Sequence, residues 1–364
     1  MKNSFWNNRK VFITGHTGFK GSWLTLWLNS LGAKICGYAL KPASKKSLFY
    51  EADVSKGIES NFANILNYKV LCEKINNFSP EVVFHLAAQP LVKKSYLKPL
   101  DTFSTNISGT INLLESLRYC KNIRSIVVVT TDKVYKNKET KDGYRESDSL
   151  GGFDPYSSSK ACCEIITNCY RSSFFKNKNL KIGIATARAG NVIGGGDYSE
   201  NRLVPDIFRS IKEKKAIKVR NIESTRPWQH VLEALNGYIT LAESLYYNHK
   251  KYSEAWNFGP RSQDCRKVKW ILSEFQKKHN FDIIDTSNHM NDHESKTLNL
   301  DISKSLKKLS WKPYLPINEA IQLTSQWFKQ KEGGKLPSQI IKDQINYYEE
   351  KKLFQSQSIR DHIQ

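Results

Sequence analysis

A tyrosine and a lysine four residues apart are the first candidates for chemistry in this sequence. Tyr156 and Lys160 are separated by three serines, and residues at that spacing fall on one face of a helix. A lysine ammonium beside a tyrosine phenol lowers the pKa of the phenol, so that the phenolate can accept a proton at neutral pH. The pair alone is a weak signal, because the same two residues often lie on ordinary helix surfaces.

A glycine-rich segment near the N-terminus gives the pair its context. Gly15, Gly18 and Gly21 follow the apolar run at residues 10–14 and precede a helical apolar pattern at residues 23–31. Glycines in such a turn let the backbone approach a pyrophosphate at the N-terminus of the helix. Together the two features predict sugar or alcohol oxidation by a dinucleotide. The residues of this segment expected at the cofactor are Gly15, Thr17, Gly18, Phe19 and Gly21.

Near-continuous apolar runs predict parallel strands that are buried on both faces. They lie at residues 34–39, 81–88, 125–130 and 181–187, and helical patterns such as residues 105–117 separate them. This alternation is typical of an α/β fold with a doubly wound, Rossmann-like parallel sheet.

The alternation of predicted strands and helices also suggests the domain boundaries. We expect residues 1–189 to form the dinucleotide-binding Rossmann domain, with residues 223–250 returning to it. The Gly194-Gly195-Gly196 triplet breaks the alternation, so residues 190–335 are expected to form a smaller C-terminal substrate-binding lobe. Residues 336–364 are rich in lysine and glutamine and are expected to form a polar C-terminal extension.

Composition narrows the choice of partners and location. The 364 residues carry a formal net charge of +21, but the lysines are spread along the chain and no nucleic-acid-binding motif stands out. No apolar run approaches the ~20 residues of a membrane helix. The seven cysteines have neither metal-ligand spacing nor a disulfide framework. We therefore expect a cytoplasmic protein with no metal, no membrane and no nucleic-acid partner.

Taken in chain order, these motifs resemble those of the extended short-chain dehydrogenase/reductase family, and within it the nucleotide-sugar 4,6-dehydratases. The resemblance runs from about residue 8 to about residue 330. Besides the glycine fingerprint and the Tyr156/Lys160 pair, it rests on three ordered runs: His85-Leu86-Ala87-Ala88-Gln89, Thr130-Thr131-Asp132-Lys133-Val134-Tyr135 and Arg188-Ala189-Gly190-Asn191-Val192-Ile193-Gly194.

The Asp132-Lys133 pair separates two branches of this family. dTDP-glucose dehydratases typically carry Asp-Glu at this point, whereas the CDP-glucose branch carries Asp-Lys. Residues 88–92, 191–197 and 226–233 also resemble the CDP-glucose branch. The resemblance implies conversion of CDP-glucose to CDP-4-dehydro-6-deoxy-glucose and water. The alternative is another NAD-dependent 4,6-dehydratase or an epimerase that acts on a dTDP- or GDP-sugar, and an epimerase would need no elimination acid or base.

The resemblance also implies a role for each catalytic residue. NAD accepts hydride from carbon 4 of the glucose and later returns it to carbon 6. Tyr156 takes the proton of the 4-hydroxyl while Thr131 holds that hydroxyl in line, and Lys160 lowers the pKa of Tyr156 and contacts the nicotinamide ribose. Asp132 occupies the position of the acid that protonates the leaving hydroxyl of carbon 6. Lys133 occupies the position of the base for carbon 5, which requires its ammonium to lose a proton.

Binding residues follow from the same resemblance. Leu86, Ala87 and Ala88 are expected at the cofactor. Many relatives have an acidic segment after the third strand, where this chain has Asn64, whose amide can still pair with adenine. The residues expected at the substrate are Gln89, Asn191, Arg202 and Arg226, of which the arginines match the diphosphate. His85 is expected to be a satisfied structural histidine, and the family leads us to expect a homodimer or a higher homo-oligomer.

Overall fold

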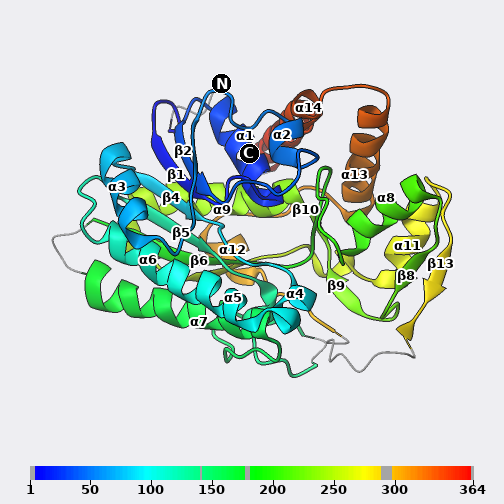
Figure 1. Ribbon diagram of the computed structural model, residues 1–364, viewed down its shortest axis with the longest axis horizontal. Coiled ribbons are helices and arrows are strands. Elements are labelled where there is room, and N and C mark those ends of the chain that lie inside the picture. The colour runs from blue at the N-terminus through cyan, green and yellow to red at the C-terminus, as the bar shows by residue number, and fades with distance from the viewer. Residues whose placement is uncertain (1–4, 140–141, 177–180, 288–296, 362–364) are drawn as a thin grey trace.

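Seven parallel strands form the central sheet, in the spatial order β11-β6-β5-β4-β1-β2-β3 (Figure 1). The computed structural model describes residues 5–139, 142–176, 181–287 and 297–361. The strands are β1 (Lys10–Thr14), β2 (Lys34–Ala39), β3 (Glu59–Phe62), β4 (Val82–His85), β5 (Ser125–Val129), β6 (Gly183–Ala189) and β11 (Ala255–Phe258). The order 3-2-1-4-5-6 is that of dinucleotide-binding folds. The predicted Rossmann-like fold class is therefore confirmed, and β11 adds one strand at its edge.

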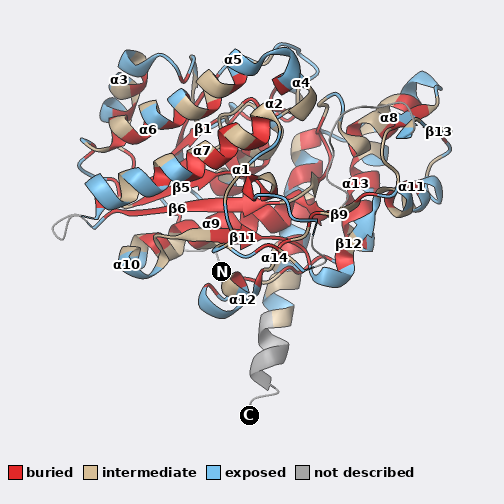
Figure 2. Cartoon of the chain, turned by 90° about the horizontal axis from the view of Figure 1, so that it is seen from below, coloured by how far each residue is buried: buried red, intermediate tan, exposed pale blue. Residues whose placement is uncertain are grey.

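Helices cover both faces of the sheet, which explains the continuous apolar runs. β5 is buried along its whole length. One face is covered by α1 (Phe19–Ser30) and α9 (Val231–Tyr247), whose Trp23 and Leu235 share one apolar core. The other face is covered by α3 (Tyr68–Phe78), α6 (Gly109–Leu117) and α7 (Pro155–Tyr170), with Leu71 and Leu113 in a second core. Figure 2 shows the buried sheet between these two layers. Short helices precede α6: α4 (Val92–Leu97), α5 (Pro99–Phe103) and the π-helical turn Ser104–Ser108.

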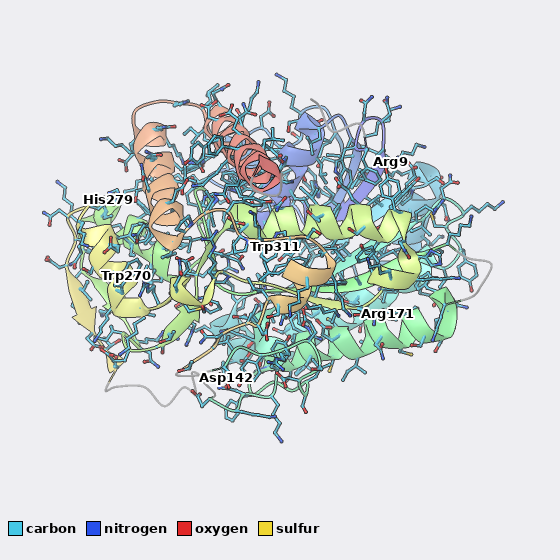
Figure 3. All side chains as sticks on the ribbon, turned by 180° about the vertical axis from the view of Figure 1, so that it is seen from behind. Arg9, Asp142, Arg171, Trp270, His279 and Trp311 are labelled. Carbon is cyan, nitrogen blue, oxygen red and sulfur yellow. The ribbon has the colours of Figure 1, made fainter. Side chains whose placement is uncertain are left out.

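A smaller lobe lies beside the carboxyl edge of the sheet (Figure 1). Its elements are α8 (Leu203–Glu213), β8 (Ile217–Val219), β9 (Thr225–Pro227), β12 (Cys265–Lys267), α11 (Val268–Gln276) and β13 (Ile283–Asp285). The lobe has a core of its own, which includes Ile207, Ile271 and Phe275. Trp270 and His279 mark its position in Figure 3. The short pair β7 (Val192–Ile193) and β10 (Gln229–His230) joins the lobe to the main sheet.

Of the expected residues 223–250, β9 lies in the lobe and α9 returns to the main sheet, and further elements return after it. α9 packs on β5 and β6, and β11 then pairs in parallel with β6. The next elements are α12 (Ser303–Lys308), which packs on β11, and α13 (Ile317–Glu332). The sequence pattern does not predict β11, because Ala-Trp-Asn-Phe contains no β-branched residue.

The polar tail begins as a packed helix. α14 (Pro337–Asp361) lies against α1 and α13 and buries Ile340, Ile341, Ile345 and Tyr348. Beyond this packed part, Leu353 and Phe354 are exposed. Within the described part of the chain, no helix combines the length and the apolar character needed to cross a membrane.

Candidate active site

The turn between β1 and α1 is built so that backbone can approach a ligand. Gly15 has a φ of +77°, and a Cβ atom there would lie 2.6 Å from the backbone nitrogen of Ala87. A Cβ atom on Gly21 would lie 2.1 Å from the carbonyl oxygen of Gly15. At Gly18, which precedes the first residue of α1, the same atom would meet nothing closer than 3.5 Å. Two glycines thus close the turn, and the third leaves room at the helix N-terminus, an arrangement that fits the pyrophosphate of NAD.

The end of β4 is tied to this turn. The backbone N–H of Leu86 donates to the carbonyl of Thr14 over 3.0 Å, and the N–H of Ala87 donates to the Thr14 hydroxyl over 3.2 Å. Thr17 lies in the turn and donates to the carbonyl of Leu40. Ala88 follows as a half-buried residue, so this short run lies at the switch point between β1 and β4.

Asn64 lies just beyond β3 and is exposed. Its side-chain oxygen accepts from the backbone N–H of Leu66 over 3.0 Å, and its carbonyl accepts from the Tyr38 hydroxyl. The oxygen therefore stabilises the local turn, which leaves the amide N–H groups as the donors for a ligand.

A cavity of about 1240 Å³ lies between the carboxyl edge of the sheet and the small lobe. It brings together residues that are far apart in the sequence, from Phe19 to Leu298. Of the predicted site residues, its walls include Phe19, Thr131, Asp132, Lys133, Tyr156, Asn191, Arg202 and Arg226. The predicted catalytic residues other than Lys160 therefore share one cavity with three of the four predicted substrate residues.

The start of α7 is fixed by its own sequence. Asp154 accepts from the backbone N–H of Ser157, and Ser157 accepts in return from the N–H of Asp154. Pro155 holds the first helical position, where its missing N–H costs nothing. This capping box fixes the turn that carries Tyr156. One helical turn later, the buried ammonium of Lys160 donates to the carbonyl of Val129 over 3.0 Å, beneath the cavity wall.

The pKa of Tyr156 is shifted in opposite directions by its surroundings. Burial raises its pKa to about 12, while the Thr131 side chain, as a hydrogen-bond partner, and the charge of Arg202 act to lower it. Burial also lowers the pKa of Lys160, against the neighbouring Cys163 and Glu164. Burial, Thr131 and Arg202 are the largest influences on the Tyr156 pKa, and the Lys160 ammonium donates to the carbonyl of Val129.

Asp132 is a buried carboxyl group with a raised pKa. It is 2% exposed, and burial raises its pKa against the charge of Lys133. One oxygen accepts from the Thr131 hydroxyl over 2.9 Å, while the other is buried and receives no hydrogen bond from any described residue. A buried carboxyl oxygen of this kind is suited to carry and donate a proton. Lys133 follows in the same short 3-10 turn and lines the cavity.

Two arginines and an asparagine line the lobe side of the cavity. Arg226 lies in β9, is 3% exposed and donates to the carbonyl of Thr225. Arg202 precedes α8 and pairs with the buried Asp197 over 2.9 Å. Asn191 lies between β6 and β7. Two guanidinium groups in one cavity suit a diphosphate.

Gln89 and His85 lie outside the cavity walls that the described residues form. The amide nitrogen of Gln89 donates to the Leu91 carbonyl and the Thr102 hydroxyl, and its oxygen accepts from the Leu91 N–H. These bonds favour a structural role over substrate binding. His85 is bonded to Thr14 and Thr110 through its two ring nitrogens, and burial lowers its pKa to about 3. The prediction of a structural histidine is confirmed.

Lys20 is a cavity residue that sequence reasoning missed. It lies inside the glycine fingerprint, between Phe19 and Gly21, and lines the cavity. Burial lowers its pKa to about 8, helped by the charges of Arg202 and Lys160. The available signal was a charged residue within a turn otherwise made of small and apolar residues.

Comparison with known proteins agrees with this geometry. The family model described as GDP-mannose 4,6 dehydratase matches residues 12–324. A CDP-glucose 4,6-dehydratase of Salmonella typhimurium is 45% identical over 335 residues, which cover 90% of this chain and 93% of that protein. A probable dTDP-glucose 4,6-dehydratase of Sinorhizobium fredii is 24% identical over 88% of this chain and 92% of its own length.

Solved structures share the fold. A dTDP-glucose 4,6-dehydratase of Bacillus anthracis in complex with NAD superposes with a TM-score of 0.73 at 22% identity, over 89% of this chain and 98% of that one. The UDP-glucose 4-epimerase of Thermotoga maritima gives 0.77 at 19% identity, over 88% and 99%. With the glycine turn and the Tyr156 helix in place, the chain belongs to the GDP-mannose 4,6-dehydratase family of the extended short-chain dehydrogenases/reductases.

Proposed function

We propose that this chain is an NAD-dependent lyase that converts CDP-glucose to CDP-4-dehydro-6-deoxy-glucose and water. The observation that carries the proposal is the meeting of Thr131, Asp132, Lys133 and Tyr156 in one cavity at the carboxyl end of β5. The 45% identical Salmonella relative, aligned over 93% of its length, supports the choice of reaction and of nucleotide.

The first step is oxidation of the carbon-4 hydroxyl. Tyr156 takes the hydroxyl proton, while the Thr131 hydroxyl holds the reacting oxygen in line. The Thr131 side chain and the charge of Arg202 both oppose the effect of burial on the pKa of Tyr156. Lys160 on the next turn adds positive charge from beneath. NAD, when bound in the glycine turn, supplies the hydride acceptor at carbon 4 and the hydride donor at carbon 6.

The second step is elimination across carbons 5 and 6. The new carbonyl at carbon 4 acidifies the proton on carbon 5, and Lys133 removes that proton. Asp132 donates a proton to the hydroxyl on carbon 6, which leaves as water while the double bond between carbons 5 and 6 forms. The burial that raises the pKa of Asp132 keeps this proton available. Lys133 returns its proton to carbon 5 after carbon 6 has been reduced.

The lobe side of the cavity suits the rest of the substrate. Arg226 and Arg202 offer guanidinium groups to the diphosphate, and Asn191 offers an amide near the sugar phosphate.

The test is turnover of purified protein with NAD and either CDP-glucose or dTDP-glucose, measured by the alkaline absorbance of a 4-keto-6-deoxy sugar. Product from CDP-glucose alone supports the proposal. Product from dTDP-glucose would overturn the choice of nucleotide, and no product from either would overturn the dehydratase reaction. An epimerase, in contrast, would keep its turnover after Asp132→Asn.

The same proposal includes a homodimer in the cytoplasm. Ile111 of α6 and Ile165 of α7 are exposed apolar residues on neighbouring helices. Phe174, just beyond α7, is also apolar and exposed. A second copy of the chain would bury them. The seven cysteines are free thiols, as is usual in a reducing compartment. Sedimentation of the native protein and of an Ile165→Glu variant tests the dimer.

A further inference from the structure

A buried ion pair lies directly behind the catalytic residues. Glu164 of α7 is 4% exposed and Arg188 of β6 is 3% exposed. The first carboxylate oxygen of Glu164 accepts from the Thr130 hydroxyl over 2.5 Å and from Nε of Arg188 over 2.9 Å. The second accepts from the Thr186 hydroxyl over 2.6 Å and from Nη2 of Arg188 over 2.9 Å. Each carboxylate oxygen thus accepts one hydrogen bond from a threonine hydroxyl and one from a guanidinium nitrogen.

The pair holds both ends of the run that carries the predicted catalytic groups. Thr130 comes immediately before Thr131 and is bound to Glu164. Tyr135 comes two residues after Lys133, and its hydroxyl accepts from Nη1 of Arg188 over 2.8 Å. The Tyr135 hydroxyl in turn donates to Asn257 of β11 over 2.6 Å. Residues 131–134 therefore span two points that are fixed to one guanidinium–carboxylate pair.

The pair also fixes α7 relative to that run. Glu164 follows Lys160 by one helical turn, so its position sets the depth of the turns that carry Lys160 and Tyr156. Arg171 holds the far end of the helix, where it donates to the Ile184 carbonyl over 3.0 Å (Figure 3). The Glu164–Arg188 pair is the attachment nearer to the cavity, and it joins α7 to β5 as well as to β6.

We propose that Glu164 and Arg188 are positioning residues that set the distance between the Tyr156 helix and the Thr131-Asp132-Lys133 run, through Thr130 and Tyr135. The inference rests on the proposed function, because it assigns to the pair the alignment of groups that act on the same sugar. A shift of about 1 Å between reacting groups lowers a rate by up to about a hundredfold. The pair contacts neither cofactor nor substrate in this role, so it affects turnover more than binding.

Two isosteric variants separate positioning from stability. Thr130→Val and Thr186→Val each remove one hydroxyl from one oxygen of Glu164, and both threonines are buried. Only Thr130 adjoins the predicted catalytic run. We expect both variants to lose similar thermal stability, while Thr130→Val lowers kcat roughly tenfold with KM for CDP-glucose unchanged, and Thr186→Val lowers kcat less than about threefold.

The hydride step gives the readout that a purely structural role would not change. With CDP-glucose deuterated at carbon 4, the primary isotope effect on kcat is expected to increase in Thr130→Val and to stay at the wild-type value in Thr186→Val. Tyr135→Phe, which removes the contact at the other end of the run, is expected to resemble Thr130→Val.

Two outcomes would overturn the positioning role. One is equal kcat in the two threonine variants. The other is an unchanged isotope effect in both Thr130→Val and Tyr135→Phe. If Thr130→Val does not fold, Tyr135→Phe alone decides. Failure of the proposed function is distinguished by the wild-type protein, which would then form no product from CDP-glucose.

Discussion

Two buried glutamates on opposite faces of the same sheet have opposite tendencies to ionise. Burial alone would raise the pKa of Glu164, but the bonds and charge of Arg188, with the two threonine hydroxyls, hold it below its usual value. Glu233 of α9 accepts from the backbone N–H groups of Tyr314 and Leu315 and from the Tyr348 hydroxyl, yet burial raises its pKa to about 7.

The difference lies in the partners rather than in the depth of burial. A contacting guanidinium keeps Glu164 charged beside the cavity, whereas neutral donors leave Glu233 close to the neutral state where α14 meets the sheet layer. Glu164 is thus kept charged beside the cavity that is proposed as the active site. Glu233, which lies in the region around the C-terminal helix α14, can be neutral.

Removal of the cation from the first pair is expected to have the largest effect. Arg188→Met leaves the Glu164 carboxylate buried without its cation, which costs about 3–5 kcal/mol. Urea unfolding measures the loss. The double variant Arg188→Met/Glu164→Met should recover part of it, and a double variant no more stable than the single one would contradict the ion-pair explanation.

The pH dependence of stability sharpens the comparison at Glu233. Because its folded-state pKa of about 7 lies above the ordinary value of 4.5, its contribution to stability is complete below pH 4.5 and is lost as the pH rises to about 7. A shift of this size corresponds to about 3 kcal/mol.

Glu233→Gln stays neutral at every pH. Relative to the wild type, the variant should therefore gain stability between pH 5 and pH 8, as measured by urea unfolding at each pH. A constant difference between the two proteins over this range would show that Glu233 is ionised throughout.

Asp132→Asn tests the cavity region, next to Glu164, where the carboxyl group of Asp132 is expected to contribute to turnover and not to stability. We expect kcat to fall about a hundredfold, equivalent to about 2.7 kcal/mol, because the departing hydroxyl loses its proton donor. CDP-glucose binding and the melting temperature should change little. A loss of melting temperature in place of kcat would assign Asp132 to the fold.

Tyr348→Phe is the smallest expected change. It removes one hydrogen bond to Glu233 from α14, at a cost of about 1 kcal/mol. Turnover with CDP-glucose should be that of the wild type, since this contact lies on the side of the sheet away from α7. A drop in kcat at constant stability would break the division between the two regions.

The main sheet could be predicted from sequence because its signals are local. The strands at residues 10–14 and 34–39 agree with β1 and β2, and the glycine turn falls between β1 and α1. β11 could not be predicted, because its sequence Ala-Trp-Asn-Phe has no β-branched residue and the strand is recognisable only through its pairing with β6. The packed start of α14 was hidden because its apolar residues are diluted by lysine and glutamine.

The site was predictable to the extent that its residues are adjacent in sequence. Thr131, Asp132 and Lys133 follow one strand, and the cavity contains all three. The internal bonds of Gln89 depend on Thr102, and the ion pair depends on strands that meet only in the fold. Lys20 lies between residues of the glycine turn, and its place in the cavity wall is recognisable only in the fold. Spacing in the sequence does not predict contacts between side chains of distant segments.

The repeated return of the chain to the sheet limits how the protein can be divided. A fragment that ended at residue 189 would lack α9, β11 and α14, so the apolar face of α1 around Trp23 and Trp27 would be left in water. The small lobe, which carries the proposed diphosphate residues Arg202 and Arg226, is inserted between segments that both pack on the main sheet. Chimeras that exchange nucleotide preference between dehydratases should graft the α8–β9 segment internally and keep both ends of the recipient chain.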